Sequence, residues 1–254
     1  MIRGAVFFDV DGTLTPTSSG QHLAEFLGHA KVIQEVQAGY GAGTLSSQEA
    51  AVLEARGWAT RTPMQVRGLL ESLPLVDGIA ETVLWCRRRG LAPVLATLAW
   101  DVVGAYLCDR YGFDRACGPR LELVDGRYSG AVAEQFDELS KRDFAVSVAA
   151  ELGVDPKRCV AVGDGRSDVP LCHTPPSISQ RTLPETALNT AVEAATACAD
   201  AHPLNRPRTS TSRRLGPPGT PDHERQPVEP LFGHKPVQPA GVRIVSEPRR
   251  RNRA

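Results

Sequence analysis

Short apolar runs and longer segments with helical periodicity alternate along much of this chain. Mostly apolar runs of four or five residues suit strands that are buried on both faces of a parallel sheet. They predict strands at residues 5–8, 92–96 and 158–162. The segments between them predict helices, each followed by a glycine, at residues 79–89, 101–111 and 141–152. This alternation indicates parallel strands joined by helices in a three-layer α/β domain.

Residues 16–75 carry no strand pattern. Residues 23–27 place apolar side chains at the i, i+3 and i+4 spacing of an amphipathic helix. Ser46 and Glu49 have the spacing of a capping box, and Pro63 stands where another helix would begin. Because the interval is too long for a loop, we predict a small helical cap, inserted after the first strand of a Rossmann-like parallel sheet.

A hairpin signal interrupts the alternation of strands and helices. Asp125-Gly126, a pair typical of tight hairpin turns, is flanked by residues 121–124 and 127–129. With residues 16–75 set aside as the cap, we assign residues 1–15 and 76–200 to the α/β core.

The composition changes at about residue 201. Residues 201–254 hold ten of the 20 prolines and hardly any periodic apolar positions, so they cannot bury enough surface to offset the entropy cost of ordering. We predict a disordered tail. Its basic end, residues 249–253, is either a contact for an anion, a nucleic acid or a membrane surface, or a solvated end without a specific partner.

The formal net charge of zero is unevenly distributed. Of the 29 basic and 29 acidic residues, 11 and 4 fall in residues 201–254, which leaves residues 1–200 with 18 and 25 and a net charge of −7. A mildly acidic globular part gives no indication of nucleic-acid binding, and we predict none.

The six cysteines include no Cys-x-x-Cys pair, which favours buried thiols in a reducing cytosol over a zinc site or a disulfide framework. No apolar run approaches the length of a membrane span. Residues 1–4 lead into the first strand without the pattern of a signal peptide. We predict a cytoplasmic protein that is not embedded in a membrane; no pattern indicates its oligomeric state.

Two carboxylates follow the first strand. Asp9 and Asp11 lie just past its carboxyl end, where open α/β sheets hold their ligands, and Gly12 permits a sharp turn. Ionised carboxylates this close repel each other, and Mg²⁺ relieves that repulsion because it prefers oxygen ligands. Asp9 can then attack phosphorus and Asp11 can act as general acid and base. The alternative is a solvated Asp-Gly turn after an ordinary strand.

This loop resembles the nucleophile loop of the haloacid dehalogenase-like (HAD) phosphatases. Asp9, Asp11, Gly12 and Thr13 match the family motif Asp-x-Asp-Gly-Thr in full. Candidates for three later motifs follow in order as far as Asp168, so the resemblance covers about two-thirds of the chain. It is greatest to the phosphoserine phosphatase-like branch, which carries a helical cap between the first two motifs.

The resemblance implies a phosphate-binding role for three residues. Thr97 follows the second predicted strand, and its hydroxyl and the backbone N–H of Leu98 would bind phosphate oxygens. Lys141, at the start of a predicted helix, would neutralise the nucleophile and the phosphoryl oxygens.

A second acidic turn supplies the remaining metal ligands. The apolar strand before Asp164 ends in a Gly-Asp-Gly turn, and Asp168 follows four residues later. If a helix begins there, both carboxylates can face one cation. The resemblance implies that Asp9, the backbone carbonyl of Asp11 and Asp164 bind Mg²⁺, with Asp168 in support.

The chain departs from the branch at several positions. The acidic residue that meets the substrate amine in phosphoserine phosphatases is Ser18 here, and the usual Asn before the last Asp is Ser167. After Leu171, prolines occupy 175–176 and the expected strand-to-helix step is displaced to residues 187–190. The departures argue against free phosphoserine as substrate and predict altered packing of the last strand.

These motifs predict a Mg²⁺-dependent phosphatase that hydrolyses a small-molecule phosphate ester through an aspartyl-phosphate, beneath a cap that excludes water. Phosphoryl transfer to a sugar, as in related mutases, and a non-catalytic phosphate-binding module stay open as alternatives. Dehalogenation is disfavoured because that branch lacks the carboxylate corresponding to Asp11.

Overall fold

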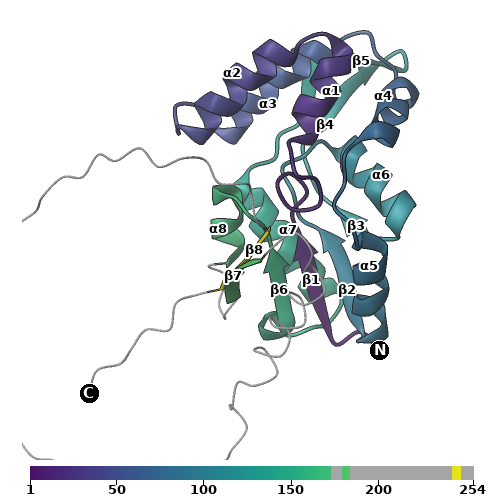
Figure 1. The fold of residues 1–254 in the computed structure, drawn as a ribbon, viewed down its shortest axis with the longest axis vertical. Coiled ribbons are helices and arrows are strands. Elements are labelled where there is room, and N and C mark those ends of the chain that lie inside the picture. The colour runs from purple at the N-terminus through teal and green to yellow at the C-terminus, as the bar shows by residue number, and fades with distance from the viewer. Residues whose placement is uncertain (173–178, 184–241, 247–254) are drawn as a thin grey trace, which may run out of the picture. The chain divides into compact units, whose positions relative to one another are not determined.

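The computed structural model describes residues 1–172, 179–183 and 242–246, the last two segments as backbone only (Figure 1). All of them fall within one compact unit. The core elements are β1 (Gly4–Phe8), α5 (Ile79–Arg88), β2 (Leu91–Leu95), α6 (Asp101–Tyr111), β3 (Arg115–Ala116), α7 (Glu138–Glu151), β6 (Cys159–Val162), α8 (Val169–Cys172), β7 (Ser179–Leu183) and β8 (Val242–Ser246). The interval predicted to form the cap, called the cap below, contains α1 (Ser19–Leu27), α2 (Ala30–Gly41), α3 (Ser47–Ala55) and α4 (Pro63–Leu69). A hairpin consists of β4 (Arg120–Val124) and β5 (Arg127–Glu134).

Strand β1 lies inside a sheet of order β3-β2-β1-β6-β8-β7, in which the first four strands are parallel. Phe8, the last residue of β1, is in register with Leu95 of β2 and Val162 of β6. The carboxyl ends of these three strands therefore lie at one edge, and the residues that follow each strand are brought together there.

Alternate residues of β1 face opposite sides of the sheet, as the period of a strand requires. Val6 and Phe8 belong to a core cluster that includes residues of α5 and α6, whereas Ala5 and Phe7 belong to a cluster that includes residues of α7. Helices thus cover both faces of the sheet (Figure 1). This arrangement is the three-layer α/β fold that the sequence predicts, with four parallel strands.

Helices α1–α4 occupy the interval predicted to form the cap, and its described residues include no strand. Trp58, which is buried after α3, connects them to the rest of the unit. Its ring centroid lies 5.7 Å from that of Trp100 and 5.8 Å from that of Tyr128 on β5. Thr60 N also donates to Tyr128 O at 2.9 Å. The hairpin, which the sequence assigned to the core region, therefore packs on the cap and is separate from the core sheet.

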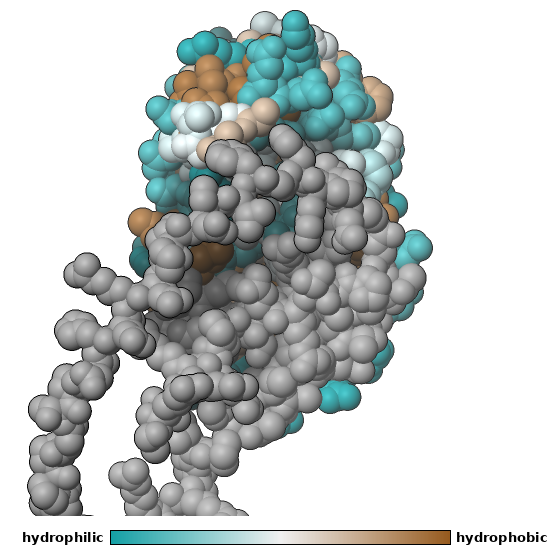
Figure 2. Space-filling model, turned by 60° about the vertical axis from the view of Figure 1, so that its left-hand side comes forward, coloured by the Kyte–Doolittle hydropathy of each residue, from teal (hydrophilic) through white to brown (hydrophobic). Residues whose placement is uncertain are grey.

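In the view of Figure 2, the surface over the end of the unit that carries the cap helices is mostly hydrophilic, with a few apolar spots. Within the described residues, no helix combines the length and apolar character needed to cross a bilayer.

Several local predictions are confirmed. Ser46 and Glu49 form the capping box of α3, and Pro63 begins α4. Asp125 and Gly126 have φ angles of 51° and 73°, the left-handed values that a type I′ hairpin turn requires at both central positions.

Two elements differ from prediction. Helix α7 begins at Glu138 rather than at 141, because the side chain of Asp137 accepts a hydrogen bond from Ser140 N at 2.8 Å and caps the helix earlier. Residues 242–246, inside the segment predicted to be disordered, form β8, which pairs antiparallel with β6 and β7. The remainder of that segment and residues 187–190 lie outside the described residues.

Candidate active site

The loop after β1 is held tightly against the end of the sheet. Asp9 N donates to Val162 O at 2.8 Å, and the backbone N–H groups of residues 13–15 all donate to Val10 O. Gly12 adopts a φ of 79°, and a Cβ atom there would lie 2.3 Å from Asp164 Oδ2. Glycine is needed at this position both for the turn and for the close approach of a carboxylate from another loop.

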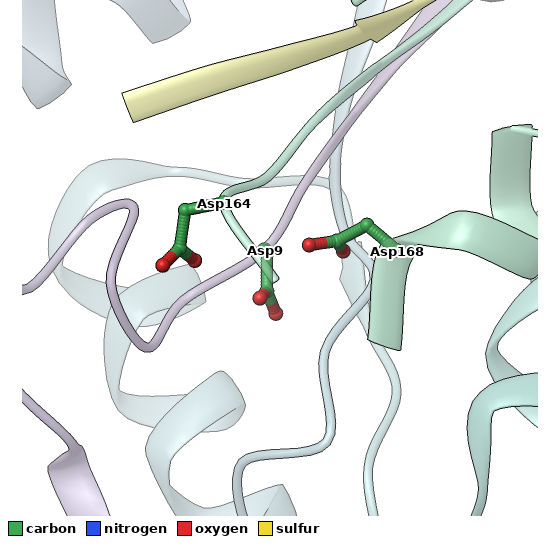
Figure 3. A group of neighbouring side chains, drawn as sticks. All are labelled: Asp9, Asp164 and Asp168. Atoms are coloured by element: carbon green, nitrogen blue, oxygen red, sulfur yellow. The ribbon is translucent and has the colours of Figure 1, made fainter. Parts of the chain in front are cut away.

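Three carboxylates meet at this edge of the sheet. Asp9, Asp164 and Asp168 each offer an oxygen atom, and these atoms all lie within 4.8 Å of one another. Figure 3 shows them converging from the end of β1 and from the segment after β6. Burial and the charge of Asp9 raise the pKa of both Asp164 and Asp168 above the ordinary value. The raised pKa values reflect burial first and then repulsion from Asp9, which Lys141 offsets only in part.

Lys141 supplies the positive charge next to this group. Its side chain is fully buried on the first turns of α7, and Nζ lies 3.0 Å from Asp9 Oδ1 and 2.5 Å from Asp168 Oδ1. Burial alone would lower the pKa of Lys141, but the charges of Asp9 and Asp168 outweigh it and raise that pKa. The lysine is therefore protonated at neutral pH and holds two of the three carboxylates in place.

The carboxylate of Asp11 is not part of the three-carboxylate group and points toward the cap. Its Oδ1 accepts a hydrogen bond from Ser19 N at 2.8 Å, and Ser18 Oγ lies 3.5 Å from Oδ2. Burial raises the pKa of Asp11 to about 6. A carboxyl group with a pKa near neutrality can give and take a proton under physiological conditions.

Thr97 lies directly after β2, where the sequence places it, and its side chain is fully buried. Its Oγ1 accepts a hydrogen bond from Ala99 N at 3.0 Å, which is the bond expected of a helix-capping or turn residue. Thr97 and Leu98 line the same cavity as Asp9 and Asp164. The structure thus brings the predicted phosphate-binding residues to the carboxylates.

That cavity has a volume of about 270 Å³ and separates the core from the cap. The loops after β1, β2 and β6 line one side, and residues of α1, α2 and α3 line the other. Sequence reasoning did not single out three residues of this lining, Tyr40, Glu54 and Arg166. The guanidinium carbon of Arg166 lies 4.3 Å from the centroid of the Tyr40 ring, so the acidic turn after β6 contacts α2 directly.

Glu54 is the acidic residue of the cap that lines the cavity. Its Oε2 accepts a hydrogen bond from Trp100 Nε1 at 3.3 Å. Burial, followed by the charge of Asp11, raises the pKa of Glu54 to about 7. The helical spacing of Glu54 from Ala50 and Ala51 places the three on one face of a helix, but no local pattern shows that this face meets the carboxylates.

The donor set fits a magnesium ion. Three carboxylates within one small space provide hard oxygen ligands, and Mg²⁺ is the common partner of such oxygens beside a phosphate. Gly12 and Gly163 leave room around them, since a Cβ atom at Gly163 would lie 2.3 Å from Cγ of Asp168. The backbone carbonyl of Asp11 as a further ligand stays a prediction.

This chain matches a family of known proteins. The family of haloacid dehalogenase-like hydrolases matches residues 6–173, a range that contains all the predicted site residues from Asp9 to Asp168. The chain belongs to this family. The prediction of a hydrolase of the HAD superfamily is therefore confirmed.

Curated relatives include several phosphoserine phosphatases. That of Albidiferax ferrireducens is 25% identical over 178 residues, which cover 65% of this chain and 73% of the relative. That of Halobacterium salinarum is 28% identical over 168 residues, which cover 65% and 80%. That of Vibrio cholerae is 25% identical over 167 residues, and the match spans about half of its length, 51%. The branch that the sequence suggested is thus the one to which the chain is similar.

Solved structures share the fold. A HAD family hydrolase from Salmonella enterica superposes with a TM-score of 0.63 at 19% identity, over 67% of this chain and 59% of that one. A phosphoserine phosphatase with bound substrate superposes with a TM-score of 0.61 at 20% identity, over 67% of this chain and 81% of that one. These likenesses confirm the predicted fold class.

Proposed function

We propose that this protein is a Mg²⁺-dependent phosphatase that hydrolyses a small-molecule phosphomonoester. The observation that carries the proposal is the meeting of Asp9, Asp164 and Asp168, next to Lys141, at a cavity that Asp9 and Asp164 line. Asp9, Asp164 and Asp168 would hold Mg²⁺, which would offset most of their negative charge and supply a positive centre for a phosphate oxygen. Family membership supports the hydrolase chemistry.

Asp9 is the proposed nucleophile. One carboxylate oxygen forms a bond to phosphorus while the bond between phosphorus and the ester oxygen breaks, which yields an aspartyl-phosphate. Lys141, 3.0 Å from Asp9 Oδ1, forms an ion pair with this carboxylate and orients it. Thr97 and Leu98, which line the cavity beside it, supply a hydroxyl and a backbone N–H for the phosphoryl oxygens.

Asp11 is the proposed general acid and base. It gives its proton to the departing ester oxygen and later takes a proton from the water that attacks the aspartyl-phosphate. That second step releases inorganic phosphate and regenerates Asp9. The raised pKa of Asp11 and its orientation by Ser19 N, at 2.8 Å, support this role. A cavity of about 270 Å³ favours a small metabolite over a macromolecular substrate.

A screen of phosphorylated metabolites tests the proposal. Purified protein with Mg²⁺ should release inorganic phosphate from a small set of esters, and the panel should include phosphoserine and amino-sugar phosphates. Transfer of the phosphoryl group to a sugar instead of water would favour the mutase alternative. A protein that binds inorganic phosphate but hydrolyses none of the esters would favour the non-catalytic alternative. We also propose that the protein acts in the cytoplasm.

A further inference from the structure

The charges that line the cavity are unbalanced on the cap side. Among the described residues that α1, α2 and α3 contribute to the lining, Glu54 is the one charged side chain, and the others are small, polar or aromatic. Arg166 is the one cation among all the described lining residues, and its guanidinium is stacked on Tyr40. The carboxylate of Glu54 therefore faces the cavity without a cationic partner among the lining residues.

Glu54 is held in place rather than free to turn away. Trp100 Nε1 donates to Oε2 at 3.3 Å, and Trp100 itself is buried against Trp58. Within the described part of the chain this is the one hydrogen bond to the Glu54 carboxylate, so most of its acceptor capacity is unused. Partial burial of a carboxylate costs free energy when its oxygen atoms lack hydrogen-bond donors, and a ligand that supplies those donors removes this cost.

The phosphate end of a substrate already has its partners in Lys141, Thr97 and the metal-binding carboxylates. Glu54 lines the cap side of the same cavity, toward which Asp11 points, and Asp11 is the residue proposed to protonate the leaving oxygen. The group that Glu54 meets is therefore carried by the leaving alcohol. We propose that Glu54 binds a protonated amine on the leaving group, which makes an aminoalkyl phosphate ester the preferred substrate class.

The leaving group could carry an ammonium, a hydroxyl or a carboxylate group at this position, and these three groups differ in charge. An ammonium group donates charge-assisted hydrogen bonds to a desolvated carboxylate, and these are about twice as strong as neutral ones. A hydroxyl group carries no positive charge to attract the carboxylate, and Ser18 and Gln37 of the lining could also bind it. A carboxylate on the leaving group would be repelled by the carboxylate of Glu54. This inference rests on the proposed phosphatase function.

Three esters of equal length test it. O-phosphoethanolamine, 2-hydroxyethyl phosphate and phosphoglycolate present an ammonium, a hydroxyl and a carboxylate at the same position. We expect kcat/KM to fall in that order, with the amine roughly 10- to 100-fold above the alcohol, as a charged hydrogen bond implies. In Glu54→Gln this ratio should fall by at least about tenfold. Ratios within one variant cancel any general loss of activity.

Glu35→Gln is the matched control, because Glu35 is an exposed cap residue that does not line the cavity. Its amine-to-alcohol ratio should equal that of the wild-type protein. Two outcomes would overturn the role of Glu54 and leave the phosphatase proposal standing. One is a wild-type protein that hydrolyses all three esters equally, and the other is an amine-to-alcohol ratio that is unchanged in Glu54→Gln. Release of phosphate from none of them, with p-nitrophenyl phosphate also intact, would overturn the phosphatase proposal itself.

Discussion

The ammonium nitrogen of Lys141 lies 3.0 Å from Asp9 Oδ1, in an environment where both side chains are buried. Helix α7 carries the lysine and the end of β1 carries the carboxylate, so the contact joins two layers of the fold. Lys141 also contacts Asp168, and its positive charge lies between two carboxylates that would otherwise repel each other.

Replacement of this lysine should therefore affect stability as well as activity. In Lys141→Met two buried carboxylates lose their counter-charge, and we expect the free energy of unfolding to fall by about 3 kcal/mol in metal-free buffer. Urea denaturation measures this, and phosphate release should be lost in parallel. Lys157→Met, at an exposed position, is the control and should resemble the wild-type protein. A Lys141→Met protein of unchanged stability would show that the ion pairs contribute nothing net.

Asp9→Asn should separate chemistry from folding. The amide keeps the shape of the side chain but is a far poorer nucleophile, so kcat should fall by at least about a thousandfold. Thermal unfolding should remain cooperative. Asp77→Asn, an exposed change of the same kind, should retain full turnover. Substantial residual activity in Asp9→Asn would remove Asp9 from the nucleophile role.

Metal binding should be visible both in activity and in stability. EDTA should silence phosphate release and Mg²⁺ should restore it. Mg²⁺ at about 100 times its Kd should also raise the free energy of unfolding by about 2.7 kcal/mol, because it binds only the folded state. Asp164→Asn should weaken both responses, since Asp164 is one of the three converging carboxylates.

Asp125→Asn is the control for this experiment. Asp125 lies in the exposed turn of the hairpin, and asparagine tolerates its φ of 51°. The variant should respond to Mg²⁺ as the wild-type protein does. Activity that is indifferent to EDTA, or Mg²⁺ stabilisation retained in Asp164→Asn, would contradict the assignment of the metal site.

Gly12 and Gly28 have nearly equal φ angles, so their alanine variants distinguish the effect of backbone strain from that of steric crowding. Gly12 and Gly28 have φ angles of 79° and 83°, but a Cβ atom at Gly28 meets nothing within 4 Å, whereas one at Gly12 would lie 2.3 Å from Asp164 Oδ2. Both alanine variants should lose about 1 kcal/mol from the left-handed conformation. Gly12→Ala should in addition displace Asp164 and reduce kcat/KM at limiting Mg²⁺. Equal activity of the two variants would show that the close approach of Asp164 does not matter.

The sequence by itself determined the three central parallel strands and most of the candidate site. Apolar runs predicted β1, β2 and β6 because buried parallel strands need both faces apolar. Asp9, Asp11 and Asp164 were found because they follow such strands, whose carboxyl ends lie at a common edge, and Asp168 because it comes four residues after Asp164. The type I′ turn at Asp125-Gly126 and the capping box at Ser46 could be predicted from the sequence, because local backbone geometry favours particular residue types at these positions.

Only the tertiary structure decided what lies opposite the carboxylates. Glu54, Tyr40 and Arg166 come from separate elements, and no local pattern says that α2 and α3 face the turn after β6. The side of the molecule on which the hairpin packs was likewise undetermined, because it depends on contacts of Trp58 with Trp100 and Tyr128 across long stretches of sequence. Strand periodicity acts over neighbouring residues, whereas the pairing of cap with core is set by shape and burial among distant ones.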